Sequence, residues 1–123
     1  MPDPVFDTNI VIDWLQKRRQ AADEMALYDR HRISRVTWAE VLAGEPPVSR
    51  DRAAYLLENF EIIELDARIA ATAAEIRFRT RMKLLDAMIL ATARVNDATL
   101  VTRNTKDFPE TMPGIRVPYR IEQ

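Results

Sequence analysis

The chain has 123 residues, a formal net charge of −1, no cysteine and one histidine, His31. This length predicts a single domain over residues 1–123, and 47% apolar with 30% charged residues is ordinary globular composition. Without cysteine, disulfide frameworks, thiolate nucleophiles and cysteine-based zinc or iron–sulfur sites are excluded, and one histidine excludes multi-histidine metal sites. The nearly balanced charge does not indicate a general electrostatic binder of nucleic acid.

Targeting and membrane segments are not predicted. No stretch reaches the ~18 apolar residues needed to span a bilayer. The first residues, Met1-Pro2-Asp3-Pro4, lack the basic-then-apolar order of a signal peptide. We therefore expect a cytoplasmic protein. The two glycines, Gly44 and Gly114, are too few for a glycine-rich phosphate-binding loop.

Apolar periodicity and turn residues predict an alternation of strands and helices. In chain order we expect strand 5–6, helix 10–17, helix 21–30, strand 32–36, helix 38–43, helix 49–59, strand 61–65, helix 67–81, helix 84–95, strand 98–102 and strand 115–117. Thr37, Ser49 and Asp66 are the expected N-caps, and Gly44 is expected to end its helix. The pattern predicts an α/β fold, a three-layer α/β/α sandwich with a mainly parallel sheet.

Four carboxylates interrupt apolar segments where an amphipathic pattern does not place a charge. They are Asp7 after the first strand, Glu40 and Asp86 inside apolar helices, and Asp107 after the strand at 98–102. A carboxylate buried alone is strongly disfavoured, so it needs a cation, hydrogen bonds, or other carboxylates around a shared metal ion. Binding sites of parallel sheets gather beyond the carboxyl ends of the strands, where we expect these groups to converge.

The only ligands available to such a cluster are hard oxygens, which favour Mg²⁺ or Mn²⁺ over zinc. Each carboxylate also has a structural alternative. Asp7 and Asp86 fit helix N-caps, Glu40 fits a solvated helix residue, and Asp107 fits a turn. The two interpretations stay open for each residue at this point.

Other conspicuous residues are assigned ordinary structural roles. The aromatic residues Trp14, Trp38, Phe60 and Phe78 are expected in the core or in an interface. His31, which lies between two arginines, is expected to be exposed. The basic run at positions 77, 79, 81 and 83 is expected to be a solvated face at the end of a helix.

Taken together, four blocks of the chain resemble PIN-domain nucleases, in particular VapC-type toxins of toxin–antitoxin pairs. The blocks are Phe6-Asp7-Thr8-Asn9, Val36 to Gly44, Leu85 to Ala93 and Val101 to Phe108, and each contains one of the four carboxylates. The resemblance covers essentially the whole chain, with the blocks in the family's order. Leu85 stands where many members of the family have proline.

The resemblance implies Mg²⁺- or Mn²⁺-dependent hydrolysis of RNA, a homodimer, and inhibition by a cognate antitoxin protein. It assigns Asp7, Glu40, Asp86 and Asp107 to the acidic positions, with Asp7 and Asp86 as the metal ligands. Glu40 then ligates the metal directly or through water, or orients the nucleophile. Thr8, Thr102 and Asn104 match supporting polar positions, and both Asn104 and Asp107 remain candidates to approach the metal.

The resemblance also concerns the substrate and the partner. Arg103 is a candidate to steer the RNA backbone, from its position alone. An antitoxin is expected to lay an apolar segment near Trp14 and Leu15 and to direct a basic side chain at the acidic cluster. The RNA that is cleaved is not determined by these residues.

Two other functions remain as alternatives. The first is a catalytically inactive PIN-like domain that only binds a partner. The second is aspartyl-phosphate transfer, as in receiver domains or haloacid-dehalogenase-like phosphatases. The latter usually carry a second acidic residue two positions after the first, where this chain has Asn9, and the acidic doublet of receivers is also missing.

Overall fold

The computed structural model describes residues 3–121. Its centre is a five-stranded sheet in which all paired strands are parallel. The strands are β1 (Val5–Phe6), β2 (Arg32–Ser34), β3 (Glu61–Ile63), β4 (Leu100–Val101) and β5 (Ile115–Arg116). Their order is β3-β2-β1-β4-β5, so the chain winds outward from β1 in both directions. The boundary between β1 and β4 is therefore the topological switch point of the sheet.

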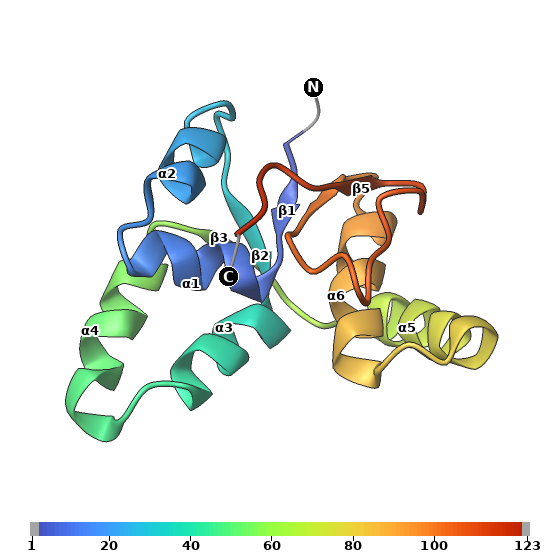
Figure 1. The fold of residues 1–123 in the computed structure, drawn as a ribbon. Coiled ribbons are helices and arrows are strands. Elements are labelled where there is room, and N and C mark those ends of the chain that lie inside the picture. Colours follow the sequence, from blue (N-terminus) through green and yellow to red (C-terminus); the bar gives the residue numbers. More distant parts are fainter. Residues whose placement is uncertain (1–2, 122–123) are drawn as a thin grey trace.

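Six helices cover the two faces of the sheet within the described part of the chain (Figure 1). They are α1 (Thr8–Leu15), α2 (Arg19–Met25), α3 (Arg35–Ala43), α4 (Pro47–Leu57), α5 (Ala67–Thr80) and α6 (Leu84–Val95). Helices α1, α2 and α4 lie on one side, and α5 and α6 on the other (Figure 1). This confirms the predicted three-layer sandwich. Within residues 3–121, no helix is both long and apolar enough to cross a bilayer.

The strands join these layers because successive side chains point to opposite faces. Val5 and Leu100 belong to the core beneath α5 and α6. Phe6 and Val101, one residue further along the same two strands, belong to the core beneath α1 and α2. Because both faces are covered, β1 and β4 are apolar at every position, as is typical of buried parallel strands.

The helix boundaries agree with the prediction where the local signal is strong. Helix α6 has the predicted bounds, and Asp66 caps α5 by accepting a hydrogen bond of 2.8 Å from the backbone N–H of Ile69. The predicted Thr37 cap is wrong. Ser34 caps α3 instead, accepting from the backbone N–H of Val36 at 3.0 Å, and Thr37 is fully buried inside the helix.

Helix α4 also begins earlier than predicted, at Pro47, with Pro46 as its N-cap rather than Ser49. Proline suits the first helical position because its fixed φ is already helical and the missing N–H needs no partner there. Gly44 ends α3 as predicted, but with a right-handed φ of −82°, so this position does not require glycine for a left-handed turn.

The exposure expected for His31 is also wrong. His31 is half-buried rather than exposed, because its ring packs against Phe6 and Phe60, with centroids 5.9 and 6.4 Å away, and donates to the Met25 carbonyl. Phe78 lies outside the core with 84% of its surface exposed. Trp14 meets the ring of Phe60 edge-on at 5.2 Å, as expected for a residue at the edge of the core.

Candidate active site

Asp7 occupies the turn between β1 and α1, at the carboxyl end of a central strand. Its Oδ1 caps α1 by accepting from the backbone N–H of Thr8 at 2.8 Å. Its Oδ2 accepts from the Thr102 hydroxyl at 2.7 Å and from the Asn9 amide at 3.2 Å. The N-cap interpretation is therefore correct, but it does not account for the second carboxylate oxygen, which is held by Asn9 of α1 and by Thr102 directly after β4.

The charge of Asp7 is poorly compensated. The side chain is almost fully buried, and no arginine or lysine among residues 3–121 forms an ion pair with it. Burial is the main reason that the pKa of Asp7 rises from 3.8 to about 6, since it outweighs the hydrogen bonds from Thr102 and Thr8. The charges of Asp86 and Glu40 raise the pKa further.

Glu40 approaches this turn from α3. Its Oε1 accepts from the Thr8 hydroxyl at 2.7 Å, and the same hydroxyl lies 3.0 Å from that of the buried Thr37. Glu40 is half-buried, so it differs from a freely solvated helix residue. The contact links the first residue of α1 to α3 and holds Glu40 near Asp7.

Asp86 lies in the first turn of α6, whose N-cap is Lys83, so the N-cap interpretation of Asp86 is wrong. Burial raises the pKa of Asp86, followed by the charges of Asp107 and Glu40, whereas Lys83 lowers it. The positive end of the helix dipole favours a carboxylate at this place. The sequence expectation that Asp86 lies near the other carboxylates is thus supported by three electrostatic couplings, to Asp7, Glu40 and Asp107.

The loop after β4 contains the remaining polar positions. The Thr102 hydroxyl, fully buried, accepts from the backbone N–H of Asn104 at 3.0 Å while it donates to Asp7. The Asn104 amide donates to Asp107 at 2.9 Å, and its oxygen accepts from the Asp107 backbone N–H at 3.2 Å. Asn104 is therefore occupied in ordering the loop, while the charge of Asp107 acts on Asp86.

The residues present fit a hard divalent cation. Burial and, after it, the charges of neighbouring carboxylates raise the pKa values of Asp7 and Asp86, and a bound divalent cation would oppose both effects. Within the described residues, no three histidine, cysteine or acidic side chains lie close enough to form a complete metal cage. Mg²⁺ needs no such cage, because it commonly binds one or two carboxylates and retains several water ligands.

The comparison with known families decides the classification. The model of the PIN domain family matches residues 5–111, and this range includes all four carboxylates. The chain belongs to the PIN-domain family. PIN-domain toxins of the VapC type are nucleases that generally use divalent metal ions, which assigns this PIN domain to the nuclease hydrolases.

Solved structures confirm the resemblance to VapC-type toxins. A toxin–antitoxin complex from Klebsiella pneumoniae has a chain that is 39% identical, with a TM-score of 0.88, covering 97% of this chain and 100% of that chain. A DNA-bound VapBC from Salmonella typhimurium is 26% identical, with a TM-score of 0.76 and coverages of 94% and 96%. VapBC2 from Rickettsia felis, bound to a DNA fragment from its promoter, is 22% identical with a TM-score of 0.76, covers 90% and 93%, and supports the fold alone. No curated protein matches the chain.

The expected role of Arg103 is not supported by the geometry of the PIN domain. Its guanidinium is held by Asp13 through two hydrogen bonds of 2.7 and 3.1 Å, so it does not extend toward a substrate. Asp13 and Glu24 are two further buried carboxylates that the sequence analysis missed. Asp13 interrupts an apolar helix in the same way as Asp86, and that signal was sufficient to find it.

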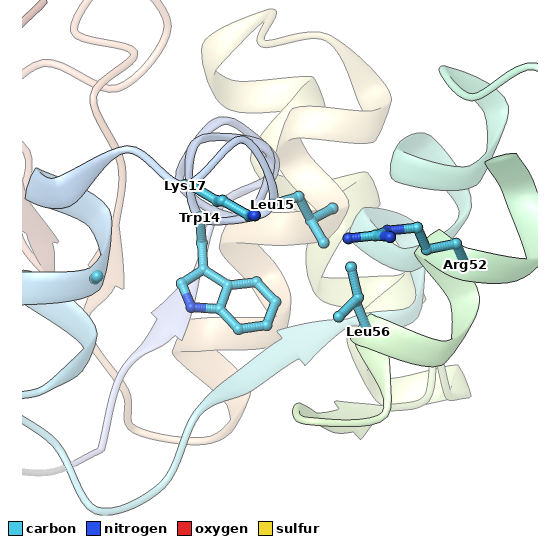
Figure 2. Close-up of a pocket in the computed structure, with 6 residues that line it drawn as sticks. Trp14, Leu15, Lys17, Arg52 and Leu56 are labelled. Carbon is cyan, nitrogen blue, oxygen red and sulfur yellow. The ribbon is translucent and has the colours of Figure 1, made fainter.

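An apolar groove of about 340 Å³ lies between α1, α2 and α4, away from the four carboxylates. Trp14 and Leu15 of α1 face Leu56 of α4 across it, with the Arg52 guanidinium directed toward Leu15 (Figure 2). Lys17 and Arg52 add positive charge at its edge. The groove is therefore placed where the sequence predicts that an apolar partner segment binds.

Proposed function

We propose that this PIN domain is a Mg²⁺-dependent endoribonuclease that acts as the toxin of a toxin–antitoxin pair. The observation that carries the proposal is the buried carboxylate of Asp7, which has no arginine or lysine partner among residues 3–121 and feels the charges of Glu40 and Asp86 at the switch point of the sheet. The three carboxylates repel one another, and a bound divalent cation reduces this repulsion. The PIN-domain match and the similarity to a toxin–antitoxin complex support the same function.

Asp7 and Asp86 are the proposed metal ligands, with Glu40 acting through a water ligand, because no three acidic side chains among the described residues lie close enough to share one ion. When bound, Mg²⁺ or Mn²⁺ lowers the pKa of a water ligand and offsets the charge of the scissile phosphate. Thr8 and Thr102 orient Glu40 and Asp7 through the hydrogen bonds described above. The order of the loop favours Asp107, positioned by Asn104, as the fourth acidic group.

The proposed partners are RNA, a second copy of the chain and an antitoxin. The similar chain from Klebsiella pneumoniae comes from a toxin–antitoxin complex, which supports an antitoxin partner here. The groove at Trp14, Leu15 and Leu56 supports binding of an antitoxin segment with apolar side chains, because its surface is apolar. Lys17 and Arg52 border it. A basic antitoxin side chain directed at Asp7 and Glu40 would compete with the metal for the same charge.

The test is cleavage of total cellular RNA by the purified protein in Mg²⁺, in Mn²⁺ and in excess EDTA, with the new 5′ ends mapped. We expect cleavage that requires metal and is lost in both Asp7→Asn and Asp86→Asn. Asp23→Asn is the matched control, because it makes the same chemical change at an exposed carboxylate of α2, whose one ion pair within residues 3–121 is with Arg19. Cleavage that persists in both site variants would remove Asp7 and Asp86 from the reaction.

Two further outcomes would each support a different function. Folded wild-type protein that neither binds Mg²⁺ nor cleaves RNA indicates an inactive domain that binds a partner. Covalent incorporation of phosphate at Asp7 from a small phosphodonor indicates aspartyl-phosphate transfer. Intact mass measurement distinguishes the second outcome from the first, because a phosphoryl group remains on the protein.

A further inference from the structure

The most extensive ionic network outside the acidic site is centred on Asp13. This α1 side chain is 2% exposed, and its Oδ2 accepts from the Arg103 guanidinium at 2.7 Å and from the Tyr119 hydroxyl at 2.6 Å. Its Oδ1 accepts from Arg103 at 3.1 Å, and the Arg18 guanidinium lies 3.6 Å away. The contact between Asp13 and Arg103 joins residues that are 90 positions apart in the chain.

Arg103 connects this network to the acidic site through its place in the chain. It lies between Thr102, which donates to Asp7, and Asn104, which holds Asp107. Its own backbone N–H donates to the Asn9 side chain at 3.3 Å. The loop after β4 is therefore attached to α1 at Asn9, through the Arg103 backbone and through the Thr102 hydroxyl at 3.3 Å, and at Asp13 through the guanidinium.

These attachments all act on α1, the helix that Asp7 caps. Asp13 lies on α1 beyond the first turn, so the paired guanidinium fixes the loop relative to the whole helix and not only to its first residue. A bidentate arginine–carboxylate pair defines both distance and orientation, which a single hydrogen bond does not. The pair thus adds a constraint on orientation to the hydrogen bonds that Thr102 and Asn9 already make between the loop and the start of α1.

We propose that Asp13 and Arg103 are positioning residues that hold the loop carrying Thr102, Asn104 and Asp107 in register with Asp7. The inference rests on the proposed nuclease function. Neither residue is proposed to touch the metal or the RNA. Displacement of reacting groups by about 1 Å can reduce an enzymatic rate about 100-fold, so loss of the pair is expected to reduce turnover more than substrate binding.

The chain contains a matched control in the pair of Glu24 and Arg116. The Arg116 guanidinium donates to Glu24 at 2.7 and 2.8 Å, and Glu24 is 5% exposed, so the chemistry and burial resemble those of Asp13 and Arg103. This second pair joins α2 to β5, and neither side chain has a hydrogen bond to the acidic site. Removing either arginine leaves a buried carboxylate without its strongest partner, so both changes destabilise the fold.

The experiment compares Arg103→Ala with Arg116→Ala in three measurements. The first is hydrogen–deuterium exchange of the backbone amides of Asn104, Asp107 and Phe108, which are hydrogen-bonded inside the loop. The second is Mn²⁺ affinity from paramagnetic resonance of the free ion. The third is kcat and KM on an RNA oligonucleotide at a temperature where each variant is folded.

For Arg103→Ala we expect loop exchange at least tenfold faster, Mn²⁺ affinity several-fold weaker, and kcat reduced at least tenfold with KM changed less than threefold. Arg116→Ala is expected to keep the wild-type loop exchange and kcat despite comparable destabilisation. Equal effects of the two substitutions on the loop and on kcat would overturn the positioning role. The exchange measurement needs no activity, so it still decides the positioning role if the wild-type protein cleaves no RNA and the proposed function fails.

A second pair of variants covers the case in which the alanine proteins do not fold. Arg103→Lys and Arg116→Lys each retain a positive charge beside the buried carboxylate but lose the two-point contact. Arg103→Lys is expected to show loop exchange and kcat intermediate between wild type and a fully released loop, while Arg116→Lys matches wild type. Identical loop exchange in the two lysine variants would refute the proposal.

Discussion

The Asp7→Asn substitution is expected to stabilise the metal-free protein at pH 7 while it abolishes metal-dependent cleavage. Asp7 has a folded-state pKa of about 6 against 3.8 as its ordinary value, chiefly because it is buried. Above pH 6 the wild-type fold must therefore keep a charge in a place that disfavours it. Asparagine has the same shape and carries no charge, so it removes this penalty.

The magnitude follows from the size of the shift. A raised folded-state pKa means that the native state binds the proton more tightly, so stability declines as the pH rises from about 4 to about 6. A shift from 3.8 to about 6 corresponds to about 3 kcal/mol at most, since one pKa unit is about 1.4 kcal/mol. Thr8 and Thr102 donate to different oxygens of Asp7, and asparagine has a single acceptor oxygen, so one of these two hydrogen bonds is lost as it stands. We therefore expect a net gain of roughly 1–2 kcal/mol.

The assay is urea unfolding of wild type and Asp7→Asn in EDTA at several pH values between 3.5 and 7.5. The difference in unfolding free energy should be smallest at pH 3.5, where Asp7 is mostly protonated in both states, and should reach its full value by about pH 7. Saturating Mg²⁺ should stabilise the wild type and leave the variant unchanged, because only the wild type retains the full ligand set.

A variant that is less stable than wild type by the same amount at pH 4 and pH 7 would refute this reasoning. That result would mean that ionisation of Asp7 carries no penalty in the folded protein. The control Asp23→Asn should change stability by less than about 0.5 kcal/mol at any of these pH values, as is usual for an exposed position.

Three other predictions concern the hydroxyl behind Asp7, the groove and the acid limit of stability. Thr102→Val removes a hydrogen bond that lowers the pKa of Asp7, so the acidic limb of the pH–rate profile should move to higher pH; an unchanged limb would argue against Asp7 as the titrating group. Leu56→Glu should weaken binding of the co-purified antitoxin at least tenfold in calorimetry and leave RNA cleavage intact, because the groove is separate from the carboxylates; a loss of cleavage with intact folding would contradict that separation. Burial acts to raise the pKa of Asp13, but hydrogen bonds from Arg103 and Tyr119 outweigh it and lower the pKa overall. The folded state therefore loses stability as the pH drops below about 4, and unfolding of Asp13→Asn should not show this loss.

Local patterns in the sequence were sufficient for much of the architecture. The strand at Val5–Phe6 and the helix at Leu84–Val95 have the predicted bounds, because an apolar run or a helical period is a short-range signal. The Asp66 cap was also correct, since the residues on either side of it, Leu65 and Ala67, have no side-chain oxygen that could cap the helix instead. Thr37 and Ser49 were wrong as caps because Ser34 and Pro46 start their helices a few residues earlier, where strand end and loop geometry decide the boundary.

By itself, the sequence determined that carboxylates interrupt apolar segments, since that is visible in the neighbours of Asp7 and Asp86. Only the tertiary structure decided which groups meet. The parallel register of β1 with β4 brings Thr102 to Asp7 across 95 positions, and the packing of α1 against the following loop pairs Arg103 with Asp13. Contacts of this kind depend on strand order and helix placement, which no local pattern encodes. They show that the Arg103 guanidinium is already paired with Asp13, which the sequence around Arg103 does not reveal.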